Sequence, residues 1–443
     1  MSDHPILALD LGTSSVRALV LDGVARPLPG ALARRPVTVA VDDDGSATLD
    51  GPSYVAALID CLDELATAGR LDGVALVAAS SQWHSVLPVD ASGSPLGPVL
   101  TWLDGRPTAP AGARPPADED AFHQRTGAWW HPLYWTVRLP WLRSRLGPSI
   151  GGFRGLTEFV LGALLEEAPM SVSVASGTGL LDIATLQWDA EAIELAAVRP
   201  GELPPLAPAD WRGRLRPQFA RRWPALSDAG WAPPTGDGAA SNVGSDAADV
   251  RRVGITVGTS AAVRVVQDAP AGQPLPHLPA GLWRYRVDQR RTVSGVAFSA
   301  GGNIYAWARP VLRLPEGPEL EAALVATTPD DLPWADPRLG GDRPPGRLPP
   351  GSGELRGIGF ATTAVEIFAA LMEGVCRQVA AGLGEIESTL DGPVEVMLGG
   401  GAAAASAWLR AAFERKLAPR RVIHVGQPEV GATGAALVAI GRA

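Results

Sequence analysis

The order of apolar and polar positions predicts an α/β chain in which short buried strands and amphipathic helices follow one another. Residues 6–9 and 16–21 are runs of small apolar and β-branched residues, as expected for two strands, and a short polar turn separates them. Residues 252–257 and 262–266 repeat this arrangement past the middle of the chain. The repetition predicts two similar hairpins, one in each half of the protein.

Other apolar patterns extend this architecture. Apolar residues between 54 and 65 fall at helical spacing, and residues 74–79 are a short buried strand. In the second half, Thr363 and Glu366 form a capping box ahead of a long apolar helix. Residues 393–398 and 421–425 are predicted strands, residues 408–417 a helix between them, and the small residues 429–436 a closely packed closing helix.

Two proline-rich segments are predicted to be irregular. Residues 107–118 are expected to form a surface excursion, and residues 326–353 a long loop over a cleft. Residues 127–134 read Gly-Ala-Trp-Trp-His-Pro-Leu-Tyr. Such a concentration of rings is expected to face a cavity or a core.

The turns of the two hairpins carry similar chemistry. The first reads Asp-Leu-Gly-Thr-Ser-Ser at residues 10–15, and the second reads Val-Gly-Thr-Ser-Ala-Ala at residues 257–262. Glycine lets the backbone close, and the hydroxyl residues offer N–H and O–H donors that suit a phosphate. Each turn taken alone is more typical of a plain hairpin. Two copies favour a pair of phosphate-binding turns that face each other across a cleft.

Composition narrows the classes of function. The 443 residues suffice for two domains, and the pattern restarts near Ala248, so we predict domains at 1–248 and 249–443. A net charge of -9 argues against a nucleic-acid surface and favours a small-molecule partner. Cys61 and Cys376 lie in apolar helical patterns without metal-ligand spacing, which predicts buried free thiols. Neither a signal peptide nor a membrane-spanning run is evident, so we expect a cytoplasmic protein.

Lys416 is the only lysine in the sequence. A Walker-type nucleotide loop and a protein kinase both require a lysine on the phosphates, so neither can be built here. A bound nucleotide would instead have its charge met by backbone N–H groups, hydroxyls, Mg²⁺ and arginine.

Several motifs together resemble the FGGY carbohydrate kinases, and they cover essentially the whole chain. They are Asp-Leu-Gly-Thr-Ser-Ser at 10–15, Gln-x-His at 82–84, Trp-x-Asp-x-Arg at 102–106, Gly-Asp-Gly at 236–238, Gly-Thr-Ser at 258–260 and Gly-Gly-Gly at 399–401. This resemblance implies an actin-like ATPase fold, with two ribonuclease-H-like domains flanking a central cleft for ATP and sugar. Residues 131–134, 175–182 and 236–242 are most similar to gluconokinase-type members.

The resemblance also implies roles for two aspartates. Asp237 is implied to be the base that accepts the proton of the attacking sugar hydroxyl, although its Gly-Asp-Gly setting alone fits a turn former or helix cap. Asp10 is implied to support Mg²⁺ through water, the alternative being a capped turn.

The nucleotide site is implied in the same way. Its residues are Thr13, Ser14, Ser15 and Arg17 on one side of the terminal phosphates, Thr259 on the other, and Gly301, Gly401 and Ala405 along the nucleotide. Arg17 also fits a solvated strand cation.

The implied sugar ligands are Trp83, His84, Trp102, Asp104, Tyr134, Asp237 and Gly238. This mixture supplies directed hydrogen bonds and apolar ring faces, both of which a polyol needs. His84 also fits a structural histidine, and Trp83 and Trp102 fit core rings.

Two departures from the family pattern bear on the substrate. Gluconokinase-like members usually carry Cys-Pro-Leu where this chain has Ala-Trp-Trp at 128–130, and the residues usual after the adenosine motif are replaced around 410–414. We therefore expect an ATP- and Mg²⁺-dependent kinase of a sugar or sugar acid, gluconate first. Two alternatives remain: a xylulose or polyol kinase, and a catalytically quiet binder that signals by domain closure. A homodimer is also compatible with the sequence. A purely structural protein would leave the repeated turns unexplained.

Overall fold

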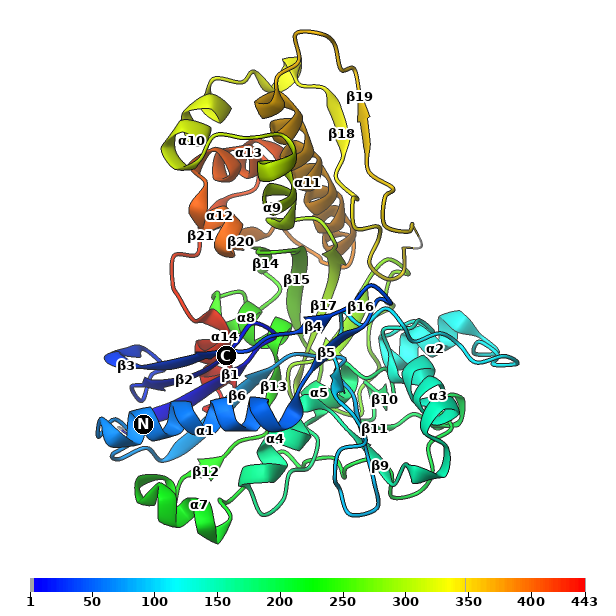
Figure 1. Cartoon of the computed structure of the whole chain (residues 1–443), viewed down its shortest axis with the longest axis vertical. Helices are drawn as coiled ribbons and strands as arrows, with labels where there is room; N and C mark the ends of the chain where they lie inside the picture. The colour runs from blue at the N-terminus through cyan, green and yellow to red at the C-terminus, as the bar shows by residue number, and fades with distance from the viewer. Residues whose placement is uncertain (1–3, 347, 443) are drawn as a thin grey trace.

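The computed structural model describes residues 4–346 and 348–442, which form two lobes stacked along the long axis of the molecule (Figure 1). Each lobe is built on one six-stranded sheet. The first sheet has the order β12-β6-β1-β2-β3, and β13 also pairs with β6. Its strands are β1 (Ile6–Leu11), β2 (Ser15–Leu21), β3 (Pro27–Pro36), β6 (Leu76–Ser81), β12 (Gly230–Trp231) and β13 (Thr235–Gly236).

The second sheet repeats the topology of the first. Its order is β16-β17-β15-β14-β20-β21. In both sheets an antiparallel hairpin is followed by a third antiparallel strand on one side and by parallel strands on the other. This shared order confirms the prediction of two ribonuclease-H-like units. The strands of the second sheet are β14 (Arg252–Val257), β15 (Ala261–Asp268), β16 (Trp283–Arg286), β17 (Arg291–Phe298), β20 (Glu395–Gly399) and β21 (Val422–His424).

Helices cover both sheets. In the first lobe they are α1 (Gly51–Thr67), α4 (Leu156–Leu164), α7 (Pro217–Arg222) and α8 (Asp237–Gly244). In the second lobe they are α9 (Asn303–Val311), α10 (Gly317–Val325), α11 (Ala364–Glu387), α12 (Gly401–Ala405) and α13 (Ala407–Leu417). Thr363 and Glu366 form the predicted capping box at the start of α11.

Smaller elements extend the first lobe, with α2 and α3 at the right of the view (Figure 1). They are β4 (Ala40–Val41), β5 (Ala47–Leu49), β7 (Leu87–Val89), β8 (Val99–Leu100), β9 (Gly152–Arg154), β10 (Leu181–Asp182), β11 (Gln187–Trp188), α2 (Glu119–Thr126), α3 (Trp135–Leu146), α5 (Val172–Ser176) and α6 (Ala190–Leu195).

Most local predictions from the sequence hold. Both hairpins, the strands and helices around them and the irregular segment 107–118 occur as expected, and Cys61 and Cys376 are buried free thiols. The segment 326–353 is not wholly irregular, because β18 (Trp334–Asp336) lies within it and pairs with β19 (Glu354–Arg356). Its residue 347 lies outside the described part of the chain.

The helix α11 is long and apolar enough to span a membrane by those two criteria. Two-thirds of its most apolar window, 67%, is buried inside the protein. Its residues Leu371, Val375 and Val379 belong to the main core of the second lobe. The apolar character of α11 is therefore explained by packing against the second sheet.

The last helix of the chain, α14 (Val430–Ala439), returns to the first lobe (Figure 1, red). Along β1, the residues Leu7 and Leu9 face α1 and α4, whereas Ile6 and Ala8 face the alanines of α14. The domain boundary near residue 248 stays a prediction, but the segment 430–439 packs on the first sheet.

The helices α8 and α14 cross with their backbones in contact. A Cβ atom on Gly434 would lie 1.8 Å from the carbonyl oxygen of Ala240, and one on Gly244 would lie 1.9 Å from that of Val430. Backbone atoms cannot move away as a flexible side chain would, so glycine is required at both positions.

We predict that Gly434→Ala lowers the free energy of unfolding by about 3 kcal/mol or more, because the added methyl group forces the two helices apart. The matched control is Gly384→Ala in α11, where an added Cβ meets nothing within 4 Å. The control is expected to be neutral or up to about 1 kcal/mol more stable. Urea denaturation measures both, and equal stabilities for the two variants would contradict the prediction.

Glu158 in α4 generates a prediction about pH. Its Oε2 accepts the N–H of Gly155 at 3.0 Å, while Oε1 is buried without a partner among the described residues. Burial raises the pKa of this carboxyl to about 7. The folded state therefore favours the protonated acid, and its contribution to stability is present below the ordinary pKa of 4.5 and lost as pH rises through about 7.

We expect the wild type to lose of the order of 2 kcal/mol of stability between pH 5 and pH 8 relative to Glu158→Gln, which cannot ionise. The contributions of all other titrating groups cancel in this comparison, because both proteins contain them. Denaturation curves at the two pH values provide the measurement. Parallel pH dependences would show that Glu158 does not titrate in this range.

Candidate functional site

A cavity of about 250 Å³ lies between the two lobes. The first lobe contributes its loops and the start of α8, and the second contributes β15, β16, β17 and the segment before β19. The lining residues are Thr13, Trp83, His84, Trp102, Trp129, Leu133, Tyr134, Asp237, Gly238, Ser260, Ala261, Ala262, Arg264, Trp283, Tyr285, Ala297, Arg343 and Pro344.

The cavity brings together much of the predicted site. Both hairpin turns reach it, through Thr13 on one side and Ser260 on the other. Among the predicted sugar ligands, all but Asp104 line it. The remaining predicted residues lie outside this lining and are described below.

Trp83 explains the glycines around Asp237. Its indole is buried, and its Nε1 donates to the carbonyl oxygen of Ser173 at 2.9 Å. A Cβ on Gly236 would lie 2.0 Å from the indole, and one on Gly238 would lie 2.5 Å from it. The two glycines therefore let the start of α8 pack against the Trp83 ring. Trp83 is both a core residue and part of the cavity wall.

His84 has a defined tautomer. Its backbone φ is +66°, and its Nδ1 lies 2.6 Å from the carbonyl oxygen of Gly177. A carbonyl can only accept, so Nδ1 carries the proton and Nε2 is left as an acceptor. Burial, with Arg138 nearby, lowers the pKa of His84 to about 3. The neutral ring can therefore accept a hydrogen bond from a sugar hydroxyl.

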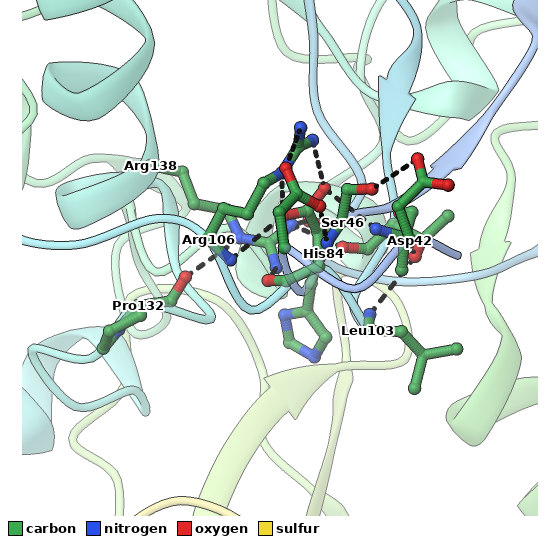
Figure 2. Close-up of polar contacts among 11 residues, drawn as sticks. Asp42, Ser46, His84, Leu103, Arg106, Pro132 and Arg138 are labelled. Atoms are coloured by element: carbon green, nitrogen blue, oxygen red, sulfur yellow. Dashed lines mark hydrogen bonds and ion pairs between the residues drawn. The ribbon is translucent and has the colours of Figure 1, made fainter. Parts of the chain in front are cut away.

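Arg138, in α3, holds the loops that carry these residues. Its guanidinium donates to the carbonyl oxygens of His84, Thr101, Asp104 and Pro132 at 2.8 to 3.2 Å. Figure 2 shows this network, with the His84 ring pointing away from it. The sequence analysis missed Arg138, because nothing in its local pattern marks an arginine that binds four carbonyl groups.

Asp104 is not placed in the cavity. Its Oδ2 accepts from Arg106 Nη2 at 2.6 Å and from the N–H of Ala47 at 3.2 Å, and its side chain is fully buried. This carboxylate stabilises the loop that carries Trp102. Its role as a direct sugar ligand stays a prediction, and the geometry favours a structural role.

Asp237 is the first residue of α8 and faces the cavity. The residue is exposed on the cavity side, while the protein around its carboxylate keeps much of the water away. Burial raises the pKa of Asp237, and the guanidinium of Arg264 opposes that shift. Arg264 lies in β15 and also lines the cavity, and its Nε is buried without a hydrogen-bond partner among the described residues. The site thus joins a carboxylate from one lobe to a cation from the other.

Asp10 is the next-to-last residue of β1 and lies on the face that packs against α14. Burial raises its pKa to about 6, the charge of Arg17 opposes this, and Asp237 and Glu429 add to it. Arg17 Nη1 lies 3.6 Å from Asp10 Oδ2 and 2.7 Å from Glu429 Oε2. Arg17 is therefore ion-paired rather than solvated, and Glu429 is a member of the site that the sequence analysis missed.

The two hairpin turns are held from behind in similar ways. In the first, the Tyr54 hydroxyl donates to the carbonyl oxygen of Gly12 at 2.8 Å. In the second, the N–H of Gly302 donates to the carbonyl oxygen of Gly258 at 2.7 Å. Ser14 and Thr259 are exposed, whereas the Ser15 hydroxyl is buried and accepts from Arg17.

The predicted nucleotide residues of the second lobe lie around its hairpin. A Cβ on Gly301 would lie 2.7 Å from the backbone of Ser260, so Gly301 packs directly on the turn. Gly400 has a φ of +99° and contacts the backbone of Val257. Gly401 and Ala405 are exposed in α12, and space is open beside Gly401.

Aromatic rings join the lobes at the base of the cavity. The hydroxyl groups of Tyr134 and Tyr285 are 2.6 Å apart, and the Trp83 ring lies 4.9 Å from that of Tyr285. Trp283 and Trp129 complete the wall. The segment 127–134 thus faces the cavity, as expected, through Trp129, while Trp283 and Tyr285 were missed because their sequence reads as an ordinary strand.

Within residues 4–346 and 348–442, no group of three or more His, Cys, Asp or Glu side chains is arranged to hold a metal ion. This still suits Mg²⁺, which commonly binds one or two carboxylates and keeps several waters beside substrate phosphates. The carboxylate of Asp10 is a ligand of this kind.

Comparisons with known proteins agree with this geometry. Residues 5–244 match the model of the FGGY family of carbohydrate kinases, N-terminal domain, and residues 253–441 match that of its C-terminal domain. The chain is 24% identical to a gluconokinase of Bacillus subtilis, covering 91% of this chain and 81% of that protein. It is 28% identical to a xylulose kinase of Streptomyces coelicolor, covering 98% and 87%.

The fold is shared with solved structures. The crystal structure of gluconate kinase from Lactobacillus acidophilus aligns with a TM-score of 0.84 at 22% identity, covering 99% of this chain and 89% of that one.

We predict that the His84 ring stays neutral from pH 5 to pH 9, because its pKa of about 3 lies below this range. Nuclear magnetic resonance of the ring protons measures this directly, with His84→Gln used to assign the signal. The chemical shifts of His84 are expected to be constant over the range. An inflection near pH 6.5 would contradict the burial and tautomer described above.

Proposed function

The chain belongs to the FGGY family of carbohydrate kinases, and from this premise we propose that it transfers the γ-phosphate of ATP to a primary hydroxyl of a sugar acid, with gluconate as the first acceptor to test. The observation that carries the proposal is the position of Asp237. Its carboxylate faces a cavity that both hairpin turns also reach.

Asp237 is proposed to be the catalytic base. Phosphoryl transfer has a loose transition state, so catalysis consists mainly of alignment and charge compensation. A carboxylate that accepts the hydroxyl proton orients the attacking oxygen toward phosphorus. The raised pKa of Asp237 makes it a better proton acceptor, and Arg264 keeps enough positive charge nearby for the ionised form to persist.

The hairpins are proposed to bind the terminal phosphates. Thr13 and Ser14 would donate from the first lobe and Thr259 from the second, while Arg17 and Ser15 stabilise the first turn. Asp10 would hold Mg²⁺ through water, where the ion neutralises phosphate charge. Gly301, Gly401 and Ala405 are proposed to border the rest of the nucleotide, and the space beside Gly401 is open.

The sugar would occupy the ring-lined end of the cavity. Neutral His84 offers an acceptor for a hydroxyl, and Trp83, Trp102 and Tyr134 offer apolar faces. Gluconate is favoured by the motif resemblance and by the gluconokinase relatives. A neutral ketose is the second candidate, because xylulose kinases match over as much of this chain.

The rival from a different class is a catalytically quiet binder. The Trp129 ring lines the cavity where gluconokinase-like members usually carry a smaller residue, and its Nε1 donates to the carbonyl oxygen of Ala280 at 3.0 Å. An assay of ADP release over a panel of aldonates, ketoses and polyols separates the two functions. The cytoplasmic location and the homodimer remain predictions.

We predict that Asp237→Asn lowers kcat by about 10²- to 10⁴-fold, because the amide cannot accept the proton. Binding of ATP is expected to be unchanged. Asp228→Asn is the matched control, since Asp228 is exposed and outside the cavity lining. Coupled ADP-release kinetics measure both variants. Full activity of Asp237→Asn would remove this residue from its assigned role, and no turnover by the wild type on any acceptor would favour the quiet binder.

A further inference from the structure

Arg343 is a cavity residue that neither the motifs nor the proposed chemistry uses. It lies between β18 and β19, in the long segment that approaches the first lobe, and it lines the cavity with Pro344. Its guanidinium carbon lies 4.2 Å from the centre of the Trp102 ring. The cation–π contact fixes the position of the guanidinium and leaves its N–H donors available.

The guanidinium of Arg343 lacks a protein acceptor within the described residues. In the part of the chain that the structure describes, the Arg343 side chain contacts the Trp102 ring and makes no hydrogen bond or ion pair, and it is half-buried. Three buried arginines of the chain behave differently. Arg138 and Arg286 both donate to backbone carbonyl oxygens, and Arg291 pairs with Asp288. An arginine in a cavity wall without an acceptor is arranged for an anionic ligand.

The charge balance of the cavity points the same way. Its lining carries two guanidinium groups, Arg264 and Arg343, and one carboxylate, Asp237. Arg264 and Asp237 interact electrostatically with each other, whereas burial alone accounts for the lowered pKa of Arg343. Since His84 is neutral, the residues of the lining carry one uncompensated positive charge. A neutral ketose or polyol would leave that charge unpaired, and a carboxylate would balance it.

We infer that Arg343 binds the carboxylate of the acceptor, so that the enzyme selects an aldonic acid whose primary hydroxyl is directed to Asp237. The planar fork of a guanidinium matches a carboxylate through two parallel hydrogen bonds, and the Trp102 ring supports it from behind. This inference deepens the proposed function and rests on it, because the acceptor is taken to occupy the same cavity.

The test uses three variants of the full-length protein. Arg343→Gln removes the charge and keeps a polar side chain, and Arg343→Lys keeps the charge without the fork. Arg356→Gln is the matched control, because Arg356 also lies on an indole, that of Trp334 at 4.8 Å, and pairs with Glu354 outside the cavity. The probes are D-gluconate and its neutral counterpart of equal length, D-glucitol.

Calorimetry with gluconate in the absence of nucleotide tests the contact itself. A charge-assisted hydrogen bond is worth about 1.5–3 kcal/mol, so Arg343→Gln should weaken gluconate binding about 10- to 150-fold. Arg343→Lys should fall between this variant and the wild type, and Arg356→Gln should match the wild type. In turnover assays, kcat/KM for gluconate should fall by the same factor in Arg343→Gln, with activity on glucitol or xylulose unchanged.

Three outcomes would overturn the inference. An equal loss on gluconate and on neutral acceptors would assign Arg343 a structural role. A raised KM for ATP with every acceptor would assign it to a phosphate. If the wild type phosphorylates a neutral sugar but does not bind gluconate, the protein is a kinase and the contact between Arg343 and a carboxylate is wrong. Gluconate binding that depends on Arg343 without turnover of any acceptor would instead overturn the proposed function alone.

Discussion

The backbone contact between α8 and α14 is the constraint on which the acidic part of the site depends. The helix α8 begins at Asp237, and the first turn of α14 lies over β1, where a Cβ on Gly431 would be 3.4 Å from an Asp10 carboxylate oxygen. Side chains at the crossing would separate the helices and change the spacing between these carboxylates. The last helix of the chain therefore lies beside both Asp237, the proposed base, and Asp10, the proposed Mg²⁺ residue, which belong to the first lobe.

Arginine supplies nearly all of the cationic side chains of this protein, in which Lys416 is the only lysine. A guanidinium stays charged even where burial lowers its pKa to about 10, as at Arg138 and Arg286, and its five donors can bind several carbonyl oxygens at once. These arginines join loops from distant parts of the sequence. Arg343 has the same chemistry but no protein acceptor within the described residues, which is why it stands apart from the structural arginines.

The parts of the site that could be predicted from the sequence are local. The hairpin turns and Asp237 lie in short motifs, and the capping box at Thr363 depends on residues three apart. Arg264 and Tyr285 reach the cavity only after the second lobe folds against the first, and no local pattern marks them. Asp104 differs from these residues, because its ion-pair partner, Arg106, lies only two positions further along the sequence.

The hydroxyl groups of Tyr134 and Tyr285 form a hydrogen bond between the lobes, beside the rings that line the cavity. Two further bonds cross the same boundary: the N–H of Arg284 donates to the carbonyl oxygen of Gly127 at 3.0 Å, and the Ser173 hydroxyl donates to that of Arg286 at 2.8 Å. Any movement that separated the lobes at the ring-lined end would have to break all three bonds.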